Sequence, residues 1–114
     1  MSETATAETP VLDLLARMTF DSLEASSLDA QSIALVRIAA LVASDAPAVS
    51  YALNLAAAGD VGLDVDDVRG VLTAIAPIVG TSRVAAATGR IAVAIGVALE
   101  VAEADMYDDL DEQP

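Results

Sequence analysis

The chain has 114 residues, of which 55% are hydrophobic and only 3% aromatic, as expected for one domain with a core of small aliphatic side chains. Its formal net charge is −13, and it contains no cysteine and no histidine. This composition excludes disulfides, thiolate metal sites and thiol or imidazole catalysis. The acidity argues against nucleic acid and anionic membranes as partners, because both require basic patches.

The N-terminal part predicts a flexible segment followed by a short helix. Residues 1–9 are polar and lack the basic and apolar regions of a signal peptide. Pro10 then opens an amphipathic helix with apolar residues at helical spacing: Val11, Leu14, Leu15 and Met18. Residues 21–27 predict a polar connector.

Two apolar helices are expected next. Asp29 is interpreted as the N-cap of a helix over residues 30–44, whose single charge is Arg37. A helix that is apolar nearly all round should be buried all round. Asp45 and Pro47 are interpreted as the capping acid and first-turn proline of a third helix, which ends near Ala58 before two glycines.

The C-terminal half predicts two more helices and an acidic tail. Asp64 should cap a helix that frays after Pro77 and ends at Gly80. Thr81 or Ser82 starts the last helix, expected to run to about residue 104. Arg90 and Glu100 interrupt its apolar run, so it is interpreted as a buried helix and not as a membrane span. Residues 105–114 are predicted to be a disordered acidic tail.

Five helices and no convincing strand predict an all-α protein, with a single domain over residues 10–104. The second, third and fifth of these helices are too apolar for a monomer of this size to cover, because such a domain hides only about two thirds of its unfolded surface. The surplus predicts a homo-oligomer. Without cysteine or a leader sequence, a cytoplasmic location is expected, and the bias toward Arg, Ala, Val and Asp is typical of a bacterial protein of high GC content.

Four segments resemble the carboxymuconolactone decarboxylase family, which includes the alkylhydroperoxidase D-like proteins. They are residues 32–43 (SIALVRIAALVA), 54–58 (NLAAA), 62–72 (GLDVDDVRGVL) and 76–84 (APIVGTSRV). The resemblance rests on helix order and small residues. It implies a five-helix alkylhydroperoxidase D-like bundle that assembles as a trimer or hexamer.

The catalytic residues of that family are absent here. Its peroxidase branch uses Cys-x-x-Cys-x-x-x-His, and that spacing places Pro47, Ser50 and Asn54 where the reactive residues would lie. The glutamate of the preceding helix falls near Leu35. The decarboxylase branch also uses a histidine, again replaced by Asn54. Thiol peroxidase activity is therefore excluded, and decarboxylase activity cannot be transferred from the family.

Arg37 is the first candidate ligand-binding residue, because a guanidinium in an apolar helix needs a partner. It could anchor a small carboxylate or lactone in a pocket between helices. The favoured interpretation is a structural ion pair with Asp45, Asp64 or an acid of a neighbouring subunit.

Ser50, Tyr51 and Asn54 are the other candidates, since they lie within one turn where the family's active site would be. They could orient a small polar ligand, although hydrogen bonding between helices is the favoured interpretation. Ser50 has no nearby base to activate it as a nucleophile. Asp64, Asp66 and Asp67 resemble a metal-binding cluster, but at a helix start capping is favoured, so neither metal nor cofactor is predicted.

Two functional hypotheses follow. The preferred one is a non-catalytic structural or small-ligand-binding homo-oligomer. The alternative is a lyase or hydrolase that acts on a lactone or small carboxylic acid, with Arg37 and Tyr51 in place of histidine. A shared pocket beside Arg37 and Asn54 would favour the enzyme, whereas an ion-paired Arg37 with no cavity beside it would argue against one.

Overall fold

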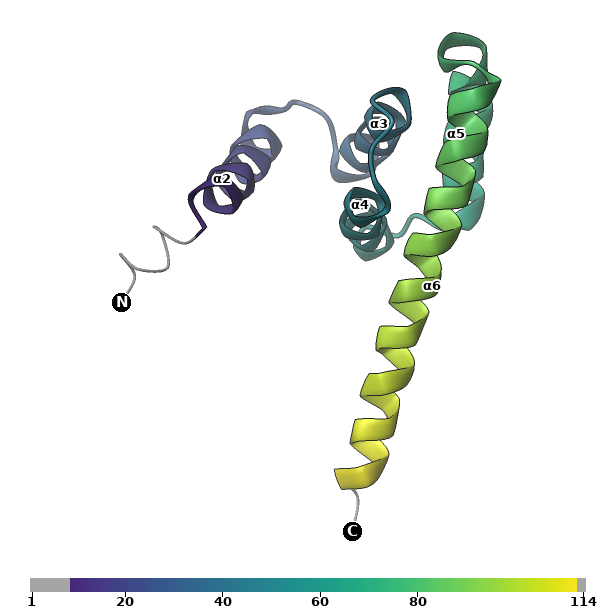
Figure 1. The fold of residues 1–114 in the computed structure, drawn as a ribbon. Coiled ribbons are helices and arrows are strands. Elements are labelled where there is room, and N and C mark those ends of the chain that lie inside the picture. The colour runs from purple at the N-terminus through teal and green to yellow at the C-terminus, as the bar shows by residue number, and fades with distance from the viewer. Residues whose placement is uncertain (1–8, 113–114) are drawn as a thin grey trace.

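A computed structural model describes residues 9–112, with side chains as far as Gly96. Within that range the chain forms five helices and no strand, which confirms the all-α prediction. They are α2 (Pro10–Ala25), α3 (Ala30–Ala43), α4 (Ala48–Asp60), α5 (Val65–Val79) and α6 (Thr81–Glu112) (Figure 1). Residues 1–8, predicted to be flexible, lie outside the described part of the chain.

Three of the predicted helix starts are confirmed. Pro10 occupies the first turn of α2, where its missing N–H costs no hydrogen bond. The Asp29 carboxylate accepts the Ser32 backbone N–H at 2.8 Å and so caps α3. At α5, Asp64 and Asp67 form a reciprocal capping box, each carboxylate accepting the other's backbone N–H.

The predicted role of Asp45 is wrong, because this residue ends α3 and does not cap α4. Asp45 is left-handed (φ 58°), its N–H bonds to the Val42 carbonyl at 3.2 Å, and the Ala46 N–H reaches the Leu41 carbonyl at 3.0 Å. This pattern is a Schellman motif, which satisfies the last carbonyls of a helix. Pro47 instead occupies the N-cap position of α4 and provides no side-chain cap.

Two helices are longer than the sequence suggests. α2 continues to Ala25, through most of the expected connector, and α6 runs to Glu112 where a disordered tail was predicted from residue 105. Acidic residues oppose the helix dipole at a C-terminus, which favoured the prediction of a tail. No glycine or proline interrupts residues 97–112, however, and Ala, Leu, Met and Glu are good helix formers.

The core lies among α3, α4, α5 and α6 and is made largely of small side chains. Ile38, Val42 and Tyr51 are its largest fully buried residues, and Val68, Ile91 and five alanines complete the buried cluster: Ala34, Ala46, Ala58, Ala87 and Ala94. The closest helix pairs are α4 with α6, α3 with α4 and α3 with α5. The helix over residues 30–43 is therefore buried on one side only, since Val36 remains 55% exposed.

α2 and the C-terminal half of α6 lie away from this core (Figure 1). α2 contributes no buried residue, and the far half of α6 extends beyond the other helices. The radius of gyration is accordingly 16.7 Å, compared with about 13 Å for a compact domain of this length. No helix in the described range is long and apolar enough to cross a membrane.

Candidate functional site

A cleft of about 560 Å³ separates α2 from the hairpin of α3 and α4. Its wall is mostly apolar and includes a few polar side chains. The lining residues are Leu15, Met18, Thr19 and Ser22 of α2, Arg37, Ala40 and Leu41 of α3, and Leu53, Asn54 and Ala57 of α4. A concave apolar surface with a few polar groups is the usual form of a small-ligand site.

Arg37 provides the only ionisable side chain in this lining. Its Nη2 donates hydrogen bonds to the Thr19 carbonyl, at 3.2 Å, and to the Ser22 hydroxyl. Thr19 and Ser22 are three residues apart and therefore share one face of α2. These partners orient the guanidinium but carry no charge, so no carboxylate among the side chains of residues 9–96 neutralises its positive charge.

The expected ion pairs of Arg37 with Asp45 or Asp64 are not formed. Asp45 pairs with Arg90 of α6, and Asp64 is occupied in the capping box of α5. Among the side chains of residues 9–96, the remaining ion pair joins Asp66 to Arg69. Whether an acid of a neighbouring subunit meets Arg37 stays a prediction.

Asn54 lies in the same cleft as Arg37, as one of the two functional hypotheses requires. Its Nδ2 donates to the Ser50 carbonyl one turn earlier, at 2.9 Å. This bond fixes the amide on the cleft side of α4, beside Leu53 and Ala57. Ser50 itself is half-buried and does not line the cleft.

Tyr51 faces the core and not the cleft. It shares the buried side of α4 with Ala58, seven residues later, and is 0% exposed. Its hydroxyl is buried without a hydrogen-bond partner among the described residues. Burial raises the pKa of the Tyr51 phenol above its ordinary value of 10.0, opposed by nearby Arg90 and assisted by Asp45. Tyr51 is therefore not placed to contact a ligand beside Arg37.

The acids at the start of α5 form its capping box and an ion pair within the same helix. Asp64 and Asp67 cap it, and Asp66 pairs with Arg69 at 2.7 Å. No group of three or more potential metal ligands occurs among the described residues. The predicted role of this cluster in capping is thus confirmed by its hydrogen bonds.

Thr19 and Ser22 are the site residues that sequence reasoning missed. The sequence placed Ser22 in a connector, and it gave no sign of where the first helix would lie relative to Arg37. Their spacing of three residues was the available signal, but it identifies a shared face only once the segment is known to be helical.

The cleft can bind an anion but provides no acid or base. Among the described lining residues the one ionisable side chain is the guanidinium of Arg37, and the other polar side chains are the hydroxyls of Thr19 and Ser22 and the amide of Asn54. No protein-family model, curated protein or solved structure matches this chain. The resemblance to carboxymuconolactone decarboxylases therefore remains a hypothesis drawn from the sequence pattern.

Proposed function

We propose that this chain is a carboxymuconolactone-decarboxylase-like helical protein without catalytic residues, which binds a small carboxylate as a homo-oligomer. The observation that supports binding is the guanidinium of Arg37, which lines a mostly apolar cleft and is held there by uncharged partners. A carboxylate would accept charge-assisted hydrogen bonds from it. The apolar body of the ligand would lie along Leu15, Met18 and Leu53.

One observation supports the enzyme alternative and another argues against it. Arg37 and Asn54 line the same cleft, which that hypothesis required. Tyr51, its second reactive residue, is buried in the core instead. A lyase or hydrolase would need a base in the cleft, and the described lining contains none. Binding without catalysis is therefore the better supported function.

The exposed surface supports the oligomeric part of the proposal. The chain exposes 8050 Å², whereas a compact monomer of 11.5 kDa exposes about 5800 Å². The difference exceeds the roughly 800 Å² that each partner buries in a standard interface. Large apolar residues of α2 contribute to it, including Val11 at 66% and Phe20 at 68% exposed.

Titration with benzoate, followed by calorimetry, tests the binding proposal. Benzoate combines a carboxylate with a compact apolar ring, and benzyl alcohol is the matched uncharged probe. We expect Arg37→Gln to weaken benzoate binding about tenfold or more, as loss of a hydrogen bond to a charged group does. The control Arg17→Gln removes an arginine outside the cleft and should leave binding unchanged. Equal binding by both variants, or equal binding of benzyl alcohol, would contradict the proposal.

Light scattering tests the assembly separately. The purified protein should have a mass several times 11.5 kDa, with a trimer or hexamer expected from the family resemblance. Leu14→Glu places a charge on the exposed apolar surface of α2 and should lower that mass. Arg17→Glu, the same new side chain on the polar side of α2, should not. A monomeric wild-type protein would contradict the oligomer.

A further inference from the structure

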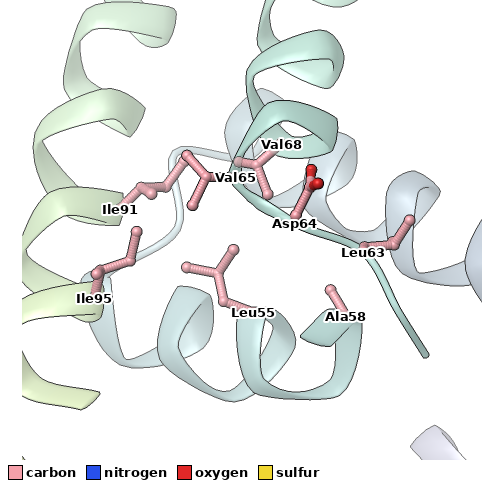
Figure 2. Close-up of a pocket in the computed structure, with 8 residues that line it drawn as sticks. All are labelled: Leu55, Ala58, Leu63, Asp64, Val65, Val68, Ile91 and Ile95. Carbon is pink, nitrogen blue, oxygen red and sulfur yellow. The ribbon is translucent and has the colours of Figure 1, made fainter. Parts of the chain in front are cut away.

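A second cavity, of about 190 Å³, lies among α4, α5 and α6 (Figure 2). It is on the other side of α4 from the Arg37 cleft, since it contacts Leu55 and Ala58 and the cleft contacts Leu53 and Ala57. Its lining residues are Leu55, Ala58, Leu63, Asp64, Val65, Val68, Ile91 and Ile95. Seven of these eight are aliphatic.

The chain reversal after α4 forms one wall of this cavity. Gly62 is left-handed (φ 89°), and the Leu63 N–H bonds back to the Ala58 carbonyl at 3.0 Å. In such a Schellman motif the residue after the glycine packs on the last turn of the helix. Leu63 and Ala58 are therefore held together at the cavity by the backbone. A larger residue at Gly62 would be strained by its positive φ.

Asp64, the one charged residue of the lining, is directed away from the hollow. Figure 2 shows its carboxylate turned toward α5, where Oδ1 accepts the Asp67 N–H at 3.0 Å. A charged ligand would lose its hydration inside this cavity and find no partner there. The chemistry of the wall therefore selects an uncharged, apolar molecule.

The volume limits the size of that molecule. Apolar cavities of about 150 Å³ lined by aliphatic and aromatic side chains stay dry and accept benzene. The present cavity is slightly larger and is partly open to solvent, so a ligand can reach it without unfolding of the core. Val65 lies at its edge with 58% of its surface exposed, whereas Val68, Ala58 and Ile91 form its buried floor.

We infer that this cavity is a second binding site, for a compact uncharged apolar molecule about the size of one six-membered ring. It is independent of the Arg37 cleft, because the two share no lining residue and select opposite properties. The Arg37 cleft offers a cation to a carboxylate, while the α4–α5–α6 cavity offers only apolar contact.

Benzene is the probe, with the full-length protein labelled for methyl NMR. Benzene should shift the methyl signals of Leu55, Ile91 and Ile95, and benzoate should not. Val65→Phe fills the edge of the cavity and should weaken benzene binding about tenfold or more. Val93→Phe is the matched control, because Val93 is equally exposed (58%) and does not line the cavity. Circular dichroism of both variants shows whether they remain folded.

Several results would overturn the site. Unshifted cavity methyls in the assembled protein would mean that nothing binds or that another copy already fills the cavity. Equal benzene binding by Val65→Phe and Val93→Phe, both folded, would place benzene elsewhere. Arg37→Gln should leave benzene binding unchanged, so failure of the carboxylate proposal and failure of this one are distinguishable.

Discussion

The helices α2 and α3 carry similar numbers of large apolar side chains, seven and six, but they pack in opposite ways. α3 buries Ile33, Ala34, Ile38 and Val42. α2 buries no residue, and all seven of its large apolar side chains are exposed: Val11, Leu12, Leu14, Leu15, Met18, Phe20 and Leu23. Hydrogen bonds from Arg37 of α3 to Thr19 and Ser22 join α3 to α2. An apolar face thus reveals that a helix needs a partner, but not whether the partner belongs to the same chain.

The largest expected loss of stability comes from a substitution in α3, the buried helix of this pair. Ile38→Ala should lower the free energy of unfolding by about 3 kcal/mol, because it removes a fully buried side chain and leaves a cavity. Leu14→Ala on α2 should change it by less than about 0.5 kcal/mol in dilute protein. Urea unfolding monitored by circular dichroism measures both.

Protein concentration sharpens that test. If a second copy covers α2, the loss of stability caused by Leu14→Ala should grow as the protein is concentrated. The loss caused by Ile38→Ala should not depend on concentration in this way, because it arises in the core of one chain. Comparable losses for both variants in dilute protein would show that α2 is part of the core after all.

The same contrast explains which parts of the fold the sequence predicted. Local signals identified the caps Asp29 and Asp64 and the turn at Gly62, because each depends on neighbours within a few residues. Asp45 was misassigned since a capping acid and a left-handed helix-ending residue can occupy the same position between two helices.

The site required information that local patterns lack. Arg37 and Asn54 were candidate ligand-binding residues for which structural roles were favoured, and the structure brings both into the lining of one cleft. Tyr51 was grouped with them because it is adjacent in sequence, yet one residue along a helix turns a side chain by about 100° and directs it to the core. The contribution of Thr19 and Ser22 depends on where α2 docks, which is a tertiary property.

A smaller effect is expected at the start of α5, which is fixed by its capping box. Asp64→Ala should lower the free energy of unfolding by about 1 kcal/mol, since it leaves the Asp67 N–H without its side-chain partner. Asp66→Ala removes an acid from the first turn of the same helix, and because its ion pair with Arg69 is exposed, the loss should be less than about 0.5 kcal/mol. Equal losses would mean that charge near the helix start, and not the cap, stabilises α5.

Only a small effect is expected near neutral pH at Tyr51, whose buried hydroxyl has no hydrogen-bond partner among the described residues. Tyr51→Phe keeps the ring and removes the unpartnered group, so the free energy of unfolding at pH 8 should change by less than about 1 kcal/mol. Loss of several kcal/mol would indicate that the hydroxyl is hydrogen-bonded in solution and that the α4 side of the core contains a polar contact.

Alkaline pH should increase the difference in stability between the wild-type protein and Tyr51→Phe. Because burial raises the pKa of Tyr51 in the folded protein, the unfolded chain ionises first as the pH rises past about 10. Wild-type stability should therefore fall as the pH rises through about 10 and should go on falling until the pH passes the raised pKa of the folded state. The stability of Tyr51→Phe should fall less. The sequence has no lysine, cysteine or histidine, and its only other tyrosine is Tyr107, so Tyr107→Phe is a direct control. If Tyr107→Phe and not Tyr51→Phe reduced the alkaline loss, the phenol that resists ionisation would belong to the C-terminal half of α6 and not to the core beneath α4.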